Sequence, residues 1–517
     1  MLPTDHRLPD LTRYIEQQSY FVLHAPRQVG KTTTLTHLGQ QLTAQGTYAS
    51  VVVSMEVGAA FPDNVGAAED AILGSWRRTA AGKLPTEVQP PPWPTANPGE
   101  RIAAALFAWC RAIPRPLVIF LDEIDALRDH VLLSVLRQLR DGYGNRPEGF
   151  PWSLGLVGLR DVRDYKIASG GGSYLQTSSP VNIKAESLTL GNFTRSEVDE
   201  LYAQHTQATG QHFDPAALER TFSWTQGQPW LVNALARQLT EKLVTDPSVS
   251  ITAADVDRAK DILIQRQDTH LDSLAERLRE PRVRALMEPM LAGTSPGEIP
   301  GDDIRFVLDL GLVRWGIGGN LEPANPIYKE VLVRSLSESP RAAMPALAPT
   351  WLRPDGTLDP AKLLEAFLGF WRQHGEPLLK SAPYHEIAPH LVLMAFLHRV
   401  VNDGGNLDRE YAIGSGRMDL LLTYGDQKVA MELKVWRKAD PLKEGLTQLD
   451  LYLAGLDLAT GWLVIFDVRG RRRPAAERTG GFVSRHARWP DGDGGACMTP
   501  REEQHEERKE NHDPLHG

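Results

Sequence analysis

The chain has 517 residues, of which 42% are hydrophobic and 23% charged, and its net charge at pH 7 is −9. That length is too great for one core and suggests roughly three or four domains, and no apolar run approaches the roughly 20 residues needed to cross a bilayer. The net charge does not indicate nucleic-acid binding, although it can hide a local basic groove. An N-terminus without a secretion signal and only two cysteines, Cys110 and Cys497, favour a reducing cytoplasm and no membrane.

The segment 21–35, FVLHAPRQVGKTTTL, has the pattern of a strand, a turn and a helix that opens with Gly-Lys-Thr. Backbone N–H groups in such a turn can surround a phosphate, Lys31 can supply positive charge to it, and the Thr32 hydroxyl can coordinate magnesium. Ala25 stands where the P-loop pattern has its first glycine, so its Cβ could crowd the turn. The predicted nucleotide-binding residues are Arg27, Gln28, Val29, Gly30, Lys31, Thr32 and Thr33.

A second segment, PLVIFLDEIDAL at 116–127, has the pattern of a buried strand that ends in Asp122 and Glu123. Acids at the carboxyl end of a central strand lie where an open parallel sheet binds its ligand. We expect Asp122 to hold magnesium through water and Glu123 to polarise the attacking water. The two segments together favour a nucleotide site over a chance Gly-Lys-Thr at a helix start.

With these residues, positions 1–335 resemble the AAA-like P-loop ATPases of the STAND and archaeal-ATPase type. The resemblance includes WSLGLVGLRDVRDY at 152–165, where Arg160 is placed like the family's sensor residue, and GQPWLVN at 227–233, which is similar to its Gly-x-Pro lid helix starting at Pro229. A surface arginine and a helix-starting proline remain alternative explanations for these two residues. The resemblance implies ATP as ligand and often slow hydrolysis, so that binding acts as a switch.

The boundaries of the first half follow from changes in pattern. The Pro-rich stretch 90–100 and the Gly/Ser-rich stretch 168–180 are interpreted as loops within one α/β core spanning 1–190. A helical lid is expected at 191–280, opened by Thr194 and Glu197 at capping-box spacing. The order of helix, two-stranded hairpin and helix predicts a winged-helix module at 281–336, whose acidic second helix favours intramolecular packing over DNA binding.

The second half begins with a stretch rich in Pro and Ala, which predicts a linker at 337–357. An α/β pattern returns at 358–467. The remaining residues, 468–517, are too polar to build a core and are expected to form a disordered tail.

In the second α/β region, AMELKVW at 430–436 puts Glu432 and Lys434 on one face of an apolar strand. The preceding GRMDLLLTYGDQKV predicts a strand that carries Asp419 and a turn at Gly425-Asp426, so Asp419 is expected within reach of Glu432. Two adjacent carboxylates can bind a divalent metal, and a lysine beside them can position water and steady charge on a phosphate. The alternative is an exposed Glu–Lys stripe.

This arrangement resembles the PD-(D/E)XK nuclease superfamily over about 358–467. The resemblance implies that Glu386, in PYHEIAPHLVLMAFLHRVV, is a further metal-binding acid of the first helix. It also implies accessory roles for Gln448 and Tyr452, one helical turn apart in GLTQLDLYLAGL.

The expected fold is therefore a multidomain α/β protein: a P-loop NTPase with a parallel sheet, a helical lid and a winged helix, then a restriction-endonuclease-like α/β domain. The leading hypothesis is a cytoplasmic ATPase that controls a magnesium-dependent nuclease in DNA processing or defence. Its cofactors would be ATP and Mg²⁺, and its partners a nucleic acid, most simply DNA, a protein trigger and further copies of the chain. The alternative is an ATP-dependent signalling switch whose nuclease-like domain binds nucleic acid or protein without cutting.

Overall fold

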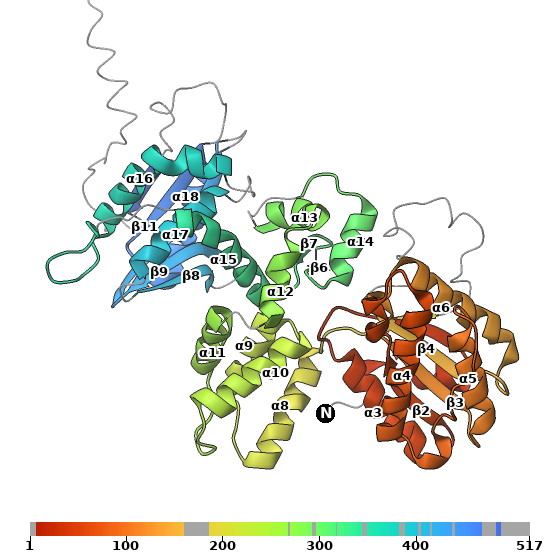
Figure 1. The fold of residues 1–517 in the computed structure, drawn as a ribbon. Coiled ribbons are helices and arrows are strands. Elements are labelled where there is room, and N and C mark those ends of the chain that lie inside the picture. The colour runs from red at the N-terminus through yellow and green to blue at the C-terminus, as the bar shows by residue number, and fades with distance from the viewer. Residues whose placement is uncertain are drawn as a thin grey trace, which may run out of the picture. The chain divides into compact units, whose positions relative to one another are not determined.

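The computed structural model describes residues 7–159, 186–266, 269–291, 296–316, 318–343, 349–381, 388–401, 405–413, 416–436, 440–467 and 482–486. The chain forms two compact units. The first contains Met1–Met287 and Pro296–Val331, and the second contains Glu288–Ser295 and Leu332–Gly517. Each unit has its own sheet (Figure 1).

The sheet of the first unit has five parallel strands in the order β2-β3-β4-β1-β5. Because all its strands run the same way, their carboxyl ends meet at one edge of the sheet. Strands β2, β3 and β4 are almost wholly buried, which explains their near-continuous apolar sequences. The strands are β1 (Tyr20–His24), β2 (Ala49–Ser54), β3 (Leu117–Asp122), β4 (Ser153–Gly158) and β5 (Glu186–Thr189).

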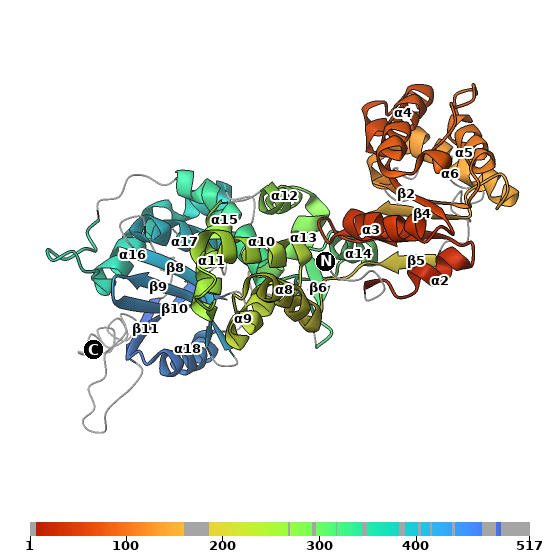
Figure 2. The same ribbon diagram turned by 90° about the horizontal axis from the view of Figure 1, so that it is seen from below.

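Helices cover both faces of this sheet, and Figure 2 shows the two helical layers. One layer contains α2 (Leu11–Glu16) and α3 (Lys31–Ala44), and the other contains α4 (Val65–Lys83), α5 (Arg101–Ala112) and α6 (Asp129–Gly142). Short helices η1 (Glu56–Ala60), η2 (Thr86–Val88), η3 (Ile124–Ala126) and η4 (Tyr143–Asn145) lie in the connections. The result is a three-layer α/β/α domain, which confirms the predicted α/β fold with a parallel sheet and fits the P-loop NTPase fold.

The Pro-rich stretch 90–100 is a loop inside this domain, as predicted, and Trp93 anchors it. The indole N–H of Trp93 donates to the carbonyl of Leu73 at 3.0 Å, and its ring lies 5.8 Å from that of Trp109. The other predicted loop, 168–180, falls outside the described residues.

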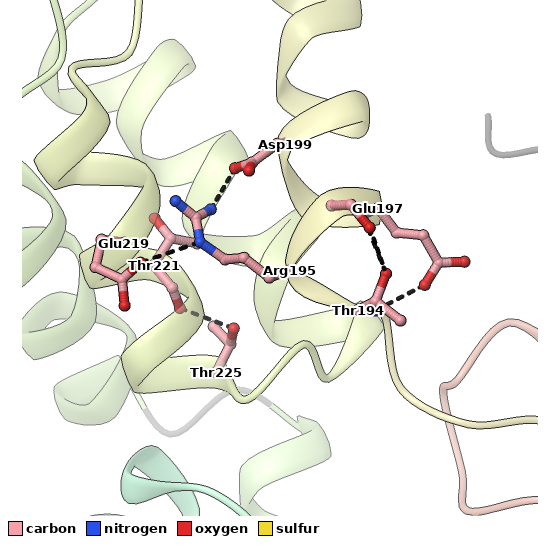
Figure 3. A network of polar contacts seen from close by, with 8 residues as sticks. Thr194, Arg195, Glu197, Asp199, Glu219, Thr221 and Thr225 are labelled. Atoms are coloured by element: carbon pink, nitrogen blue, oxygen red, sulfur yellow. Dashed lines mark hydrogen bonds and ion pairs between the residues drawn. The ribbon is translucent and has the colours of Figure 1, made fainter.

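After β5 the chain is helical, and the first helix begins with the predicted capping box. Glu197 N–H donates to the Thr194 hydroxyl, and Thr194 N–H donates to the Glu197 carboxylate at 2.6 Å (Figure 3). Arg195 then contacts Asp199 in its own helix and Glu219 in the next one. The elements are α8 (Arg195–Thr209), α9 (Pro215–Thr225), α10 (Pro229–Gln238), the π-helix η7 (Leu239–Leu243), α11 (Ala253–Arg266) and α12 (Thr269–Arg277).

Two helices, a hairpin and a third helix follow. The hairpin strands are antiparallel, with Val313 opposite Pro323, and Gly319 in the turn has φ +72°, a value that favours glycine. The elements are α13 (Pro281–Leu291), α14 (Gly301–Asp309), β6 (Val313–Trp315), β7 (Leu321–Pro323) and α15 (Pro326–Ala343).

The second unit contains a mixed sheet in the order β12-β11-β10-β9-β8, in which only the β10–β11 pair is parallel among the described strands. A parallel pair needs a crossover, and α18 supplies it between β10 and β11. The elements are α16 (Pro360–Ser381), α17 (Ala388–Val401), β8 (Gly405–Ile413), β9 (Gly416–Tyr424), β10 (Gln427–Trp436), α18 (Leu442–Leu456), β11 (Thr460–Asp467) and β12 (Phe482–His486).

The two faces of this sheet have different covers, as Figure 2 shows. Leu449 and Leu453 of α18 pack against Ala430, Leu463 and other side chains of one face. On the other face Phe466 lies 5.0 Å from Trp371 of α16. Because Glu432 and Lys434 share the parity of Ala430 along β10, they project toward the α18 side.

Two segments have structure that the predicted boundaries did not include. The linker expected at 337–357 is helical to Ala343, and Trp351 is only 3% exposed because it packs against Phe396 of the second unit. The Pro and Ala content misled the prediction, since alanine favours helices and a tryptophan favours burial.

The tail expected at 468–517 contains strand β12, which pairs antiparallel with β11. A short apolar pair, Phe482-Val483, is enough to form this strand because β11 offers it an unpaired edge. Among the residues that the structure describes, no helix is long and apolar enough to span a membrane.

Candidate functional sites

The first site begins in the loop between β1 and α3, at the carboxyl edge of the parallel sheet. Gln28 and Gly30 adopt the left-handed conformation, with φ of +59° and +92°. Ala25 does not, and it is buried while its N–H donates to the Gly158 carbonyl at 3.2 Å. The position therefore needs no glycine for its backbone, and the Ala25 Cβ packs in the core.

Lys31, the first residue of α3, folds back over this loop. Its ammonium donates to the carbonyls of Ala25 at 2.7 Å and Pro26 at 2.9 Å. Burial lowers the pKa of Lys31, against the opposing charges of Asp125 and Asp122. An incoming phosphate would replace neutral carbonyl partners with a charged one, which strengthens each hydrogen bond.

Thr32 and Asp122 meet across the end of the sheet. The Thr32 hydroxyl donates to Asp122 Oδ2 at 2.5 Å, and Asp122 Oδ1 accepts the N–H of Glu123 at 3.0 Å. Asp122 is 5% exposed. A hydroxyl oxygen next to a carboxylate fits the oxygen-rich coordination of Mg²⁺, which keeps several waters and uses few protein ligands.

Glu123 follows at the same edge, in a left-handed conformation with φ +59° that is uncommon for a non-glycine residue. The hydroxyl of Ser54, at the end of β2, donates to Glu123 Oε2 at 2.9 Å. Burial raises the pKa of Glu123, and the hydrogen bond from Ser54 opposes that shift. Glu123 is thus a stronger base than an ordinary surface carboxylate, and it is held beside Thr32 and Asp122.

A cavity of about 240 Å³ adjoins the loop within the first unit. Its lining includes Pro26 and Val29 of the loop, Leu190 after β5, Gln228 before α10, Leu312 before β6, and Tyr328 of α15. A mostly apolar cavity with a few polar groups suits a flat heterocycle.

Gln228 supplies one of those polar groups. Its Oε1 accepts the N–H of Leu231 at 2.7 Å and caps α10, whereas its buried Nε2 has no hydrogen-bond partner among the described residues. Pro229 follows as the first residue of α10, where proline is favoured. Arg160 lies outside the described residues.

The structure therefore brings the loop, Lys31, Thr32, Asp122 and Glu123 to one edge of the sheet. Sequence reasoning missed Ser54, which the parallel pairing places opposite Asp122. Ser54 could have been predicted, because it ends a buried strand that lies next to the strand ending in Asp122. Sequence reasoning also missed Gln228, although this residue lies between Gly227 and Pro229 in the segment quoted for the lid helix.

The second site lies on the α18 side of the mixed sheet. Strands β9 and β10 form a hairpin whose last described pair is Leu420 with Met431, and Asp419 is the next residue along β9. Asp419 Oδ2 accepts the N–H of Leu433 at 2.8 Å. Asp419 and Glu432 thus lie at the same end of the hairpin.

Glu432 is 3% exposed and Lys434 Nζ donates to its Oε1 at 2.9 Å. Burial, followed by the charge of Asp419, raises the pKa of Glu432 to about 7, against the opposing effect of Lys434. Burial lowers the pKa of Lys434, but the hydrogen bond and charge of Glu432 outweigh it and the net shift is upward. Glu432 Oε2 has no hydrogen-bond partner among the described residues.

A buried carboxylate oxygen without a partner is costly unless something binds it. A divalent cation shared by Glu432 and Asp419 would satisfy it and would lower the pKa of Glu432. The described residues contain no group of three or more His, Cys, Asp or Glu side chains that could hold a metal. Two carboxylates plus waters still fit Mg²⁺.

The other predicted residues of this site have different outcomes. Glu386 lies outside the described residues. Gln448, on α18, has a buried Oε1 without a described partner, while its Nε2 lies 3.5 Å from Glu444. Tyr452 is partly buried against the apolar core under α18, so packing already explains it.

No protein-family model matches the chain, and no curated protein sequence is similar to it. Solved structures similar to it include a Walker-type ATPase of Pyrococcus abyssi, with 12% identity over 64% of this chain and 96% of that one and a TM-score of 0.45. The Holliday junction branch migration motor RuvB of Thermotoga maritima has 17% identity over 63% and 93%, with a TM-score of 0.35. Cdc6p from Pyrobaculum aerophilum has 15% identity over 65% and 92%, with a TM-score of 0.34. Likenesses at this level do not identify a function, so the function has to be argued from the chain's own residues.

Proposed function

We propose that the first unit binds ATP with Mg²⁺ and hydrolyses it. The observation that carries this proposal is the convergence of Lys31, Thr32, Asp122 and Glu123 at one sheet edge. Lys31 would contact the outer phosphates, and Thr32 and Asp122 would hold the metal, directly and through water. Glu123, whose pKa is raised by burial, would orient and deprotonate the attacking water.

The cavity next to the loop supports a bound nucleoside. Its position beside Pro26 and Val29 allows a base to enter it while the phosphates lie in the loop. Gln228 and Pro229, at the start of α10, would then contact the bound nucleoside. On this proposal 191–280 acts as a lid, and α13 to α15 with the hairpin form a winged-helix module.

Isothermal titration calorimetry of the purified chain with ATP in the presence of Mg²⁺ tests this proposal. Wild type should bind, and Lys31→Ala should not, because the phosphates lose their ammonium. A matched control is Lys83→Ala at the exposed end of α4, which should bind like wild type. Equal heats for wild type and Lys31→Ala would contradict the proposed site.

We further propose that the second unit cleaves phosphodiester bonds with Mg²⁺ under control of the first. The observation that favours cleavage is the buried Glu432 oxygen without a partner, next to Asp419 and Lys434. The element order α17-β8-β9-β10-α18-β11, with β11 parallel to β10, supports a PD-(D/E)XK-like reading. The metal would activate water, and Lys434 would steady charge on the phosphate.

Cleavage of phosphodiester bonds implies a nucleic acid as the substrate, and DNA is the first to test. If the second unit only binds its partner, magnesium should still protect β9 and β10 from hydrogen exchange, but no nucleic acid should be cut. Cleavage of linear, circular or single-stranded DNA that requires Mg²⁺ and Glu432 would support the nuclease.

A further inference from the structure

Arg7 lies just before α2 and contacts two distant parts of the first unit. Its Nη1 donates to the Val29 carbonyl of the phosphate-binding loop at 3.0 Å. Its Nη2 donates to the Gly191 carbonyl, between β5 and α8, at 2.7 Å. One planar guanidinium thus joins two backbone carbonyls that are far apart in sequence.

The contact with Val29 constrains the loop at the position where it turns into α3. In a planar trans peptide the C=O and the following N–H point in opposite directions. Holding the Val29 carbonyl therefore fixes the Gly30 N–H on the side away from Arg7. Gly30 lies directly against the guanidinium, since a Cβ added to it would be 3.4 Å from Arg7 Nη1.

The contact with Gly191 reaches the start of the helical region. Arg7 also lies over the ring of Phe193, 4.7 Å from its centroid. Phe193 N–H donates to the Gly227 carbonyl at 2.8 Å, and a Cβ on Gly227 would come within 1.8 Å of the Phe193 carbonyl oxygen. Gly227 immediately precedes Gln228, the capping residue of α10, so Phe193 links Arg7 to the Gln228 side of the cavity as well.

Charge-assisted hydrogen bonds to carbonyls are stronger than neutral ones, and a guanidinium fork restricts both partners at once. A lysine in place of Arg7 would keep the positive charge but could not hold the Val29 and Gly191 carbonyls with one planar group. A change in the loop on phosphate binding would therefore be transmitted to the segment Gly191–Phe193 through a rigid group.

We propose that Arg7 is a positioning residue that orients the phosphate-binding loop and couples its occupancy to the hinge of the helical region at Gly191–Phe193. This inference rests on the proposed nucleotide site. Arg7 does not contact the reacting atoms. It acts through the Val29 and Gly191 carbonyls.

The test compares Arg7→Gln and Arg7→Lys with Arg13→Gln, a control in α2 whose side chain is 56% exposed and pairs with Asp10. Calorimetry with ATP and Mg²⁺ gives the affinity, and hydrogen exchange with and without ATP reports on the loop and the hinge. Circular dichroism melts of the nucleotide-free proteins show whether each variant is folded.

We expect Arg7→Gln to bind ATP about tenfold more weakly, because part of the binding free energy then goes into ordering the loop that Arg7 holds in wild type. At saturating ATP it should protect the loop from exchange but not residues 191–193, whereas wild type and Arg13→Gln protect both. Arg7→Lys should have an ATP affinity and a protection of residues 191–193 between those of Arg7→Gln and wild type. If Arg7→Gln does not fold, the comparison of Arg7→Lys with Arg13→Gln tests the coupling.

Hinge protection in Arg7→Gln equal to that in Arg13→Gln would overturn the coupling, even if affinity falls. If wild type binds no ATP, the proposed function fails together with this inference, and that result appears before any variant is made. The two failures are therefore distinguishable.

Discussion

Glu432→Gln should make the metal-free second unit more stable at alkaline pH. The pKa of Glu432 is raised from 4.5 to about 7 by burial and then by Asp419. The folded state thus holds this proton more tightly than the unfolded chain does, and the free energy of unfolding falls as pH rises between these two values. At about 1.4 kcal/mol per pKa unit, the ionised carboxylate costs about 3 kcal/mol above about pH 8.

Glutamine removes that charge and keeps an oxygen that can accept from Lys434. We therefore expect Glu432→Gln to raise the free energy of unfolding by about 3 kcal/mol near pH 8 without metal, and by almost nothing below about pH 4, where wild type is protonated in both states. Magnesium should stabilise wild type and not the variant. Adding it should therefore remove the difference in the free energy of unfolding between the two proteins near pH 8.

The assay is urea unfolding of the full chain in chelator, read by hydrogen exchange of peptides from β10 and β11 so that only the second unit is followed. Glu365→Gln, on the exposed side of α16, is the matched control and should change stability by less than about 0.5 kcal/mol. A Glu432→Gln variant no more stable than wild type near pH 8 would refute the reasoning about the buried carboxylate.

Further predictions concern the reacting groups. Glu123→Gln should bind ATP like wild type but hydrolyse it about a hundredfold or more slowly in single-turnover assays, because the water loses its base; unchanged hydrolysis would exclude Glu123 from that role. Ser54→Ala should raise the pKa of Glu123 further, so that the loss of ATPase activity on acidification begins at higher pH; an unshifted pH profile would show that this hydrogen bond does not matter during catalysis. Lys434→Ala should abolish DNA cleavage while Mg²⁺ binding, measured by calorimetry, partly survives because an ammonium is not a metal ligand; loss of both together would make Lys434 a structural partner of Glu432.

The first sheet and its loop were predictable because their signals are local and strong. Continuous apolar runs predict buried parallel strands, and a strand followed by Gly-Lys-Thr predicts the loop before α3. The hairpin carrying Asp419 and Glu432 was predictable for the same reason, since a Gly-Asp turn joins two apolar strands. What the sequence could not give is the side-chain geometry at the site, such as Ser54 on Glu123.

The failures were of a different kind. Arg7 contacts Gly191 from 184 residues away, and no local pattern predicts such a pairing. The segment around Trp351 and strand β12 were misjudged because composition was used where tertiary packing decides. A polar stretch can contribute a strand when a neighbouring edge offers it hydrogen bonds, and a Pro-rich stretch can be anchored by one buried aromatic ring.

Cleavage of DNA by the purified chain tests the central claim most directly, with linear, circular and single-stranded DNA incubated with and without ATP and Mg²⁺. The account predicts that wild type cuts at least one of them only when Mg²⁺ is present, and that ATP changes the rate. It predicts that Glu432→Ala abolishes cutting while ATP hydrolysis continues, and that Lys31→Ala abolishes the response to ATP. Cutting by Glu432→Ala at the wild-type rate, or no cutting by wild type under any of these conditions, would contradict it.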